Sequence, residues 1–129
     1  MVGRVFFVFV PVINFKNLDT IGRTNYALTM KEVRKSSVYN DWFMSLRDSR
    51  AKTRIDSRVQ RLAGGNPGDV KPVGEGISEM RIDYGPGYRI YYIDTGKEII
   101  ILLCGGDKKT QQADIVEARK IARDYEEED

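Results

Sequence analysis

The spacing of apolar residues changes along the chain, and each change marks a predicted element. Residues 30–35 alternate polar and apolar side chains with a period of two, which predicts a short strand. Residues 48–63 repeat their apolar side chains at spacings of four, four and three, which predicts a helix with one apolar stripe. The stripe consists of Ala51, Ile55, Val59 and Leu62.

Turn and capping residues set the limits of the two predicted helices. A shorter helix, capped by Ser37 or Asn40 and ending near Leu46, should precede the longer one. Gly64-Gly65 ends the longer helix, and a loop rich in glycine, asparagine and proline follows.

Strand patterns dominate residues 70–104. Strands are predicted at Val70–Val73, Ser78–Tyr84, Tyr88–Ile93 and Ile99–Cys104, with turns at 85–87 and 94–97. The strand at 78–84 should have one polar face, carrying Glu79, Arg81 and Asp83. The strand at 99–104 is apolar on both faces, as expected of a covered central strand. A last helix, with Ile115, Ala118, Ala122 and Tyr125 on one side, should begin near Thr110.

These elements predict an α+β domain with helices on one face of a small, mostly antiparallel sheet. A chain of 129 residues is the size of one domain. The pattern shows neither an internal repeat nor a linker to a second domain.

Residues 1–29 differ from the rest of the chain. The apolar run Val5–Val10 is too short to span a membrane, and it lacks a clear signal-peptide cleavage site. It could form an added strand. We favour instead an N-terminal extension of doubtful function, with an alternative start at Met30 and a functional domain at 30–129.

Composition removes several classes of chemistry. The chain has no histidine and one cysteine, Cys104, so catalytic Ser-His and Cys-His pairs are excluded. A disulfide framework or a structural zinc site would need more ligands of these types. Acid–base chemistry would have to use carboxylates, lysines or tyrosines, and no metal or cofactor is expected.

The net charge of +2 conceals a strong local bias. Residues 47–61 hold six basic and two acidic side chains, whereas residues 116–129 are net acidic. A row of arginines runs beside the apolar stripe of the longer helix, which favours an anionic partner. The row consists of Arg47, Arg50, Arg54, Arg58 and Arg61.

Two further groups are candidates for chemistry. Arg81, Arg89 and Tyr91 should share one sheet face on adjacent strands, where they would either hold a phosphate or pair with Glu79 and Asp83. The segment Gly105–Thr110 links a buried strand to a helix start, which suits either an anion or a simple glycine stop with Thr110 as the cap.

Five consecutive blocks resemble the addiction-module killer proteins, the HigB-like branch of the RelE/ParE toxin superfamily, and the resemblance covers about residues 31–125. The blocks are Arg50-Ala-Lys-Thr-Arg-Ile, Arg58-Val-Gln-Arg-Leu-Ala, Gly64-Gly-Asn-Pro-Gly-Asp-Val-Lys-Pro-Val-Gly-Glu-Gly, Glu79-Met-Arg-Ile-Asp-Tyr-Gly-Pro-Gly-Tyr-Arg-Ile-Tyr-Tyr and Leu102-Leu-Cys-Gly-Gly-Asp-Lys-Lys-Thr-Gln.

The resemblance implies a RelE-like microbial RNase fold, with N-terminal helices packed on the sheet and a C-terminal helix. It implies a cytoplasmic bacterial type II toxin that cleaves translated mRNA, without a cofactor, on the ribosome. Its implied partner is a helix-turn-helix, HigA-like antitoxin, through which alone it would reach operator DNA. No membrane partner is implied.

The resemblance also assigns residues. Arg89 matches the phosphate-stabilising arginine of the superfamily, Arg81 a basic position on the preceding strand, and Lys108 a basic catalytic position after the last strand. Tyr91 is added as a catalytic candidate. The expected RNA contacts are Lys71, a basic position in one of the family blocks, Lys109, and the arginines of the charged row, Arg50, Arg54, Arg58 and Arg61.

Three positions depart from the superfamily pattern. Glu79 lies where RelE-type toxins carry a lysine, Asp114 aligns with their late catalytic tyrosine, and the histidines of some HigB toxins are missing. The general base therefore stays open among Lys108, Tyr91 and Asp114. Two other functions remain as alternatives, a ParE-like inhibitor of gyrase and an inactive relic that only binds its antitoxin.

We predict that deleting residues 1–29 leaves a soluble, active domain, because the predicted elements and the family blocks all lie after Met30. Circular dichroism and a growth-arrest assay of residues 30–129 would check this. A truncated chain that fails to fold would contradict it.

Overall fold

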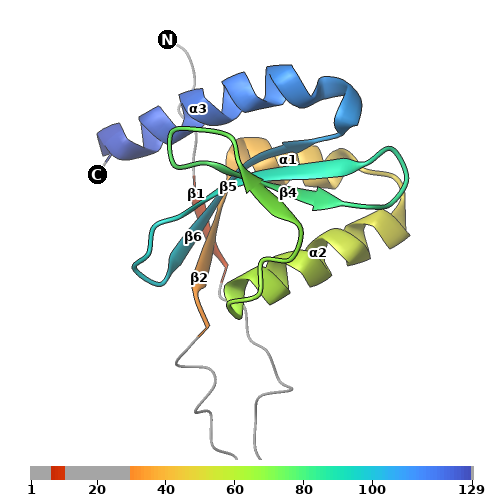
Figure 1. Ribbon diagram of the computed structural model, residues 1–129, viewed down its shortest axis with the longest axis horizontal. Helices are drawn as coiled ribbons and strands as arrows, with labels where there is room; N and C mark the ends of the chain where they lie inside the picture. The colour runs from red at the N-terminus through yellow and green to blue at the C-terminus, as the bar shows by residue number, and fades with distance from the viewer. Residues whose placement is uncertain (1–6, 11–29, 129) are drawn as a thin grey trace, which may run out of the picture.

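One sheet of six strands organises the residues described by the computed structural model, 7–10 and 30–128 (Figure 1). Its spatial order is β1-β2-β6-β5-β4-β3. Only β2 and β6 run parallel, and the other neighbours are antiparallel, so the expected mostly antiparallel sheet is confirmed. The strands are β1 (Phe7–Val10), β2 (Glu32–Ser36), β3 (Val70–Pro72), β4 (Ser78–Ile82), β5 (Tyr88–Asp94) and β6 (Ile99–Gly106).

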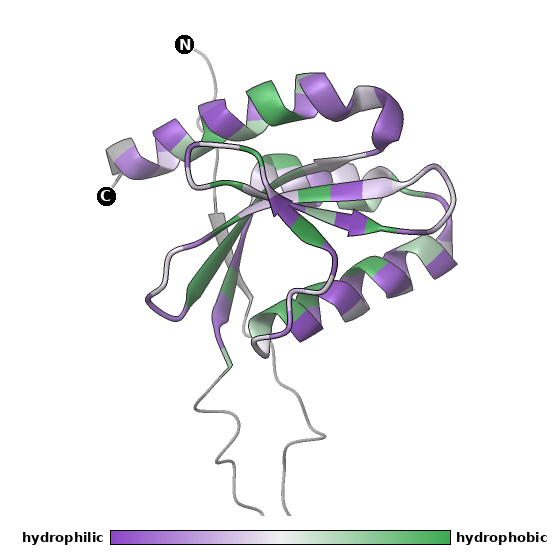
Figure 2. Cartoon of the chain, in the orientation of Figure 1, coloured by the Kyte–Doolittle hydropathy of each residue, from purple (hydrophilic) through white to green (hydrophobic). Residues whose placement is uncertain are grey.

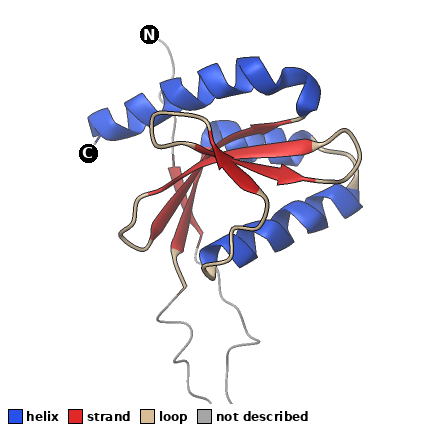
Figure 3. Ribbon diagram, in the orientation of Figure 1, coloured by secondary structure: helices blue, strands red, loops and turns tan. Residues whose placement is uncertain are grey.

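The helices lie close to the predicted ranges. They are α1 (Ser37–Ser45), α2 (Ser49–Ala63) and α3 (Gln111–Glu128), and a short 3-10 turn, η3 (Lys108–Thr110), precedes the last (Figure 3). The predicted caps of α1 were wrong by one residue or more, since the Ser36 hydroxyl accepts the Tyr39 N–H. Asp48 caps α2 by accepting from the amides of Arg50 and Ala51.

Helices cover both faces of the sheet, so the expectation of a single covered face was wrong. The predicted stripe of α2 is buried, and it joins α1 and one sheet face in a first core. On the opposite face, α3 packs Ala118, Ile121 and Ala122 against β5 and β6 (Figure 1). The reason lies in β6, which is apolar on both sides and needs two covers.

The hydropathy of the helices agrees with burial on both faces of the sheet. The helices in Figure 2 mix apolar and polar residues around their circumference, as expected when one side meets a sheet. No helix in the described part of the chain is long and apolar enough to cross a membrane.

The apolar run near the N-terminus contributes an edge strand. Strand β1 pairs antiparallel with β2, with Phe7 opposite Ser36 and Val10 opposite Val33. The added-strand alternative therefore describes Phe7–Val10, and the rest of the expected extension lies outside the described residues. The independence of residues 30–129 from this strand stays a prediction.

Two glycines at the end of β6 allow helices to approach from both sides. A Cβ on Gly105 would lie 2.3 Å from the Trp42 ring of α1, and one on Gly106 would lie 1.8 Å from Asp114 Oδ2 of α3. Both distances are far shorter than van der Waals contact. The Gly-Gly pair thus fixes where α1 and the start of α3 meet the sheet.

We predict that Gly105→Ala destabilises the protein by about 1–3 kcal/mol, because the Trp42 ring must move out of a close-packed site. Gly64→Ala is the matched control, since its Cβ would make only ordinary contacts at 3.5 Å and beyond. Urea unfolding of both variants measures the difference. Equal stability of the two would show that Trp42 does not pack against Gly105 as described.

A cationic cluster around a buried carboxylate

The candidate site is built around Glu79 in the middle of β4. Its side chain is fully buried, at 0% exposure, although the alternation of β4 predicted a polar outer face. Strand register places Lys71 of β3 on one side of it and Tyr91 of β5 on the other. The N-terminal end of α3 adds Gln111 from above the sheet.

The two carboxylate oxygens of Glu79 have different partners. Oε2 accepts hydrogen bonds from two neutral donors, Gln111 Nε2 at 2.7 Å and the Tyr91 hydroxyl at 3.0 Å. Oε1 lies among cations, with Arg81 Nε at 3.2 Å, Lys71 Nζ at 3.9 Å and Arg89 Nε at 3.9 Å. The expected pairing of Glu79 with both arginines is confirmed, whereas Asp83 is exposed and forms no ion pair within the described residues.

These contacts keep the carboxylate ionised. Burial opposes the charge, but hydrogen bonds from Gln111, Tyr91 and Arg81 and the charge of Lys71 outweigh it, so the pKa of Glu79 is lowered. Because the pKa of Glu79 is lower in the folded than in the unfolded protein, its ionisation stabilises the fold at pH values above the unfolded-state pKa. That stabilisation is lost as the pH falls through the lowered value. Such a carboxylate is poorly suited to accept a proton in catalysis near neutral pH.

The cluster carries an excess of positive charge that Glu79 does not neutralise. Arg81 and Arg89 lie directly opposite each other on β4 and β5, and together with Lys71 they set three cations against one carboxylate. Arg89 is 13% exposed and its buried Nε has no hydrogen-bond partner, while the Arg81 and Lys71 side chains are 35% and 47% exposed. The partly exposed Arg81 and Lys71 side chains are the groups of this cluster that a phosphate oxygen can contact.

Tyr91, a predicted catalytic candidate, does not face solvent. Its ring is fully buried in the core under α3, and its hydroxyl donates to Glu79. The pKa of Tyr91 is raised, mainly because the phenol is buried and secondly because the charge of Glu79 lies beside it. The phenol is therefore a structural donor to Glu79 and is unsuited to act as a base.

The segment after β6 offers no free helix end to an anion. Asp107 caps η3 by accepting from the amides of Lys109 and Thr110, and Thr110 completes a capping box. The alternative in which this segment binds an anion therefore fails, because Asp107 already occupies these amides. Thr110 is one of two capping residues and not the only one. Lys108 and Lys109 are both exposed here, and Lys108 lies beside the β4–β5 turn, 3.6 Å from the position of a Cβ on Gly87.

Asp114 lies beside the cluster, a placement that the sequence pattern did not indicate. Its carboxylate fills the space next to Gly106, and Gly106 is the cross-strand neighbour of Arg89. Burial, with the charges of Asp107 and Glu117, raises the pKa of Asp114 despite a hydrogen bond from the Thr110 hydroxyl. A half-buried carboxyl with a raised pKa has the character of an acid–base group.

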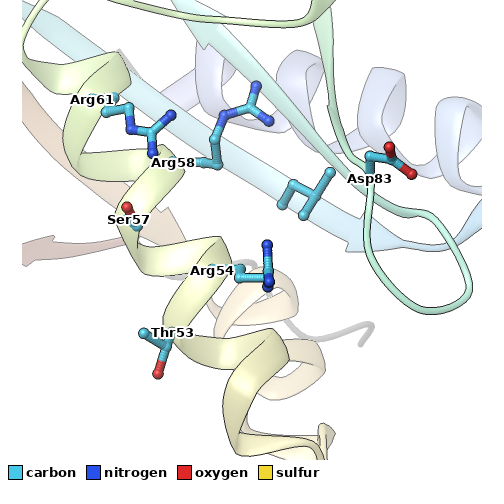
Figure 4. A pocket seen from close by; sticks show the side chains of 7 residues that line it. Thr53, Arg54, Ser57, Arg58, Arg61 and Asp83 are labelled. Carbon is cyan, nitrogen blue, oxygen red and sulfur yellow. The ribbon is translucent and has the colours of Figure 1, made fainter.

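The arginine row of α2 lies on the other face of the sheet. Arg58 is half-buried and donates to the carbonyl oxygens of Arg81 at 2.7 Å and Pro67 at 3.1 Å, so it joins α2 to β4. Arg47 precedes α2 and is exposed, as are Arg50, Arg54 and Arg61. Figure 4 shows Arg54, Arg58 and Arg61 projecting from α2 over a hollow, with Asp83 beyond it.

The structure therefore divides the predicted site residues into two groups, with Lys108 and Lys109 of η3 outside both. Lys71, Arg81, Arg89 and Tyr91 meet around Glu79, and the α2 arginines form a separate surface. Sequence reasoning missed the central role of Glu79 and the contribution of Gln111. The shared strand face of Glu79 and Arg81 was the available signal for the first, and nothing in the pattern of α3 pointed to the second.

Comparison with known proteins places the chain in a family. Residues 41–126 match the family described as Phage derived protein Gp49-like (DUF891). An uncharacterized protein of Haemophilus influenzae is 43% identical over 93 residues, which cover 72% of this chain and 94% of the relative. No solved structure matches the chain. The matched range contains α2, β3 to β6 and most of α3, and so the chain belongs to the Gp49-like family, a toxin-like family of addiction-module killer proteins.

Proposed function

We propose that the protein is the toxin of a type II toxin–antitoxin system and acts as an mRNA interferase of the HigB-like branch. It cleaves translated mRNA on the ribosome in the cytoplasm, and a helix-turn-helix antitoxin of the HigA type neutralises it. The observation that carries this proposal is the excess of positive charge around Glu79, with the Arg81 and Lys71 side chains partly exposed beside Arg89. Membership of a toxin-like family supports it.

In this proposal the cluster binds the scissile phosphate. Arg89 and Arg81 project from adjacent strands at one register position, which allows both guanidiniums to reach oxygens of one phosphate. Lys71 extends the positive field on the β3 side. Because negative charge grows on the phosphate during cleavage, preorganised cations stabilise the transition state more than the substrate.

The nucleophile is the 2′-hydroxyl of the RNA itself, so the protein has to align it and transfer protons. Of the three candidate bases, Asp114 fits the geometry best, because it lies beside Gly106 across from Arg89 and has a raised pKa. In this proposal Lys108, which is exposed at the start of η3, protonates the leaving 5′-oxygen. No metal or cofactor is required by this route.

We predict that Arg89→Ala lowers the rate of mRNA cleavage about 10²–10³-fold, as expected for loss of one group that stabilises the developing charge. The full chain is induced in bacteria, and mRNA 5′ ends are mapped after a few minutes. New in-frame cleavages in translated messages should appear with the wild-type chain and be lost in the variant.

Arg123→Ala is the matched control, because it removes an equally charged side chain from an exposed ion pair with Glu75. It should cleave like the wild-type chain. Thermal melts of both variants separate loss of chemistry from loss of folding. Growth arrest with intact messages would contradict the proposal and indicate a gyrase-type target, and no arrest by a folded wild-type chain would indicate an inactive relic.

A further inference from the structure

A hollow of about 310 Å³ lies between α2 and the segment that leaves β4, on the sheet face opposite the Glu79 cluster (Figure 4). The proposed cleavage makes no use of it. Three guanidiniums, two hydroxyls, one apolar side chain and one carboxylate line it. These residues are Arg54, Arg58, Arg61, Thr53, Ser57, Ile82 and Asp83.

Two of the three cations of this hollow are held in place by contacts of their own. Arg58 is fixed by backbone carbonyls of β4 and of the loop after α2, so it contributes charge and structure and has few N–H groups to spare. The guanidinium of Arg54 lies over the Tyr84 ring at 4.7 Å, and the Tyr84 hydroxyl donates to Asp48 at 2.9 Å. Stacking occupies the face of the guanidinium and leaves its N–H edges available to a ligand.

A second hollow continues along the same helix. It has a volume of about 480 Å³ and is lined by Ser49, Arg50, Thr53 and Arg54. Because the two hollows share Thr53 and Arg54, a chain of anions could follow α2 from Arg61 to Arg50. Successive phosphates of a single strand are such a chain, and arginines are favoured phosphate ligands.

Asp83 decides between an acidic peptide and a nucleotide as the ligand. A carboxylate among the lining residues repels the carboxylates of an acidic peptide. It suits the base of a nucleotide, because the Watson–Crick edges of unstacked bases carry N–H donors. Ile82 provides an apolar wall for the base, and guanine matches a carboxylate best because it has two adjacent donor groups.

We propose that this hollow binds one unstacked guanosine nucleotide of single-stranded RNA, with its phosphate on Arg54 and Arg61 and its base edge on Asp83. The proposal rests on the proposed function only in taking RNA as the ligand. It adds a second RNA contact on the sheet face that does not carry Arg89. Message and ribosomal RNA share this chemistry, and two arms of the experiment distinguish them.

The first arm measures fluorescence anisotropy of a labelled, 2′-O-methylated octanucleotide with one central guanosine, bound to the full chain. The 2′-O-methyl groups prevent cleavage, so binding is scored whether or not the chain is a ribonuclease. The second arm measures co-sedimentation of the chain with vacant ribosomes. The test variant is Arg54→Gln with Arg61→Gln, and Lys97→Gln with Lys120→Gln removes the same charge from exposed positions elsewhere.

The arginine variant should bind about tenfold more weakly than the control in at least one arm. If the arginine variant binds the octanucleotide more weakly than the control does, the hollow binds message. If it binds only ribosomes more weakly, the hollow binds ribosomal RNA. Asp83→Asn gives the sharper result, because it should weaken binding in that same arm. In the first arm it should also remove the preference for guanosine over an all-adenosine octanucleotide.

Three outcomes would overturn the proposal. Tighter or unchanged binding by Asp83→Asn would mean that the hollow attracts only negative charge. Preferential binding of a labelled poly-glutamate peptide over the octanucleotide would assign the hollow to an acidic protein segment. Equal binding by the arginine variant and its control in both arms would remove RNA from the hollow, while leaving mRNA cleavage at Arg89 as a separate question.

Discussion

A carboxylate buried as completely as Glu79 would destabilise the fold by several kcal/mol if its charge stood alone. Its compensation comes from different parts of the chain: Lys71 on β3, Tyr91 and Arg89 on β5, and Gln111 on α3. Each partner reaches Glu79 only if its own element is in register or correctly docked. The requirement to satisfy one ion therefore aligns the strands and the last helix.

The same ion makes the cationic cluster possible. Arg81 and Arg89 lie opposite each other in the β4–β5 register, an arrangement that mutual repulsion would disfavour without a carboxylate between them. Glu79 relieves this repulsion and still leaves an excess of positive charge at the surface. On the far side of the strand, Arg58 binds the backbone carbonyl of Arg81, so α2 supports the strand that presents the cluster.

The position of α3 depends on contacts that sequence patterns do not encode. Arg119 donates to the carbonyl of Val73 and pairs with Glu75. These contacts hold the loop between β3 and β4 against α3. Together with the lack of a side chain at Gly106, which leaves room for the Asp114 carboxylate, they bring Gln111 and Asp114 to the cluster.

Local periodicity predicted the elements well, because burial of one side follows directly from spacing. The stripe of α2, the two-sided β6 and the shared face of Arg81 and Arg89 could all be predicted in this way. The placement of α3 could not be predicted, since an amphipathic helix fits either face of a sheet. Consequently the burial of Glu79 and Tyr91 beneath it, and the carboxyl of Asp114 beside Arg89, became evident only from the tertiary structure.

The central claim is that an ionised, buried Glu79 holds the cationic cluster together. The most direct measurement is the carbon-13 chemical shift of the Glu79 carboxyl group during an acid titration, assigned with the Glu79→Gln variant. The account predicts that this carboxyl stays ionised as the pH falls past 4.5, the ordinary pKa of a glutamate. A carboxyl that titrates at or above that value would mean that the cations do not hold its charge, and would contradict the account.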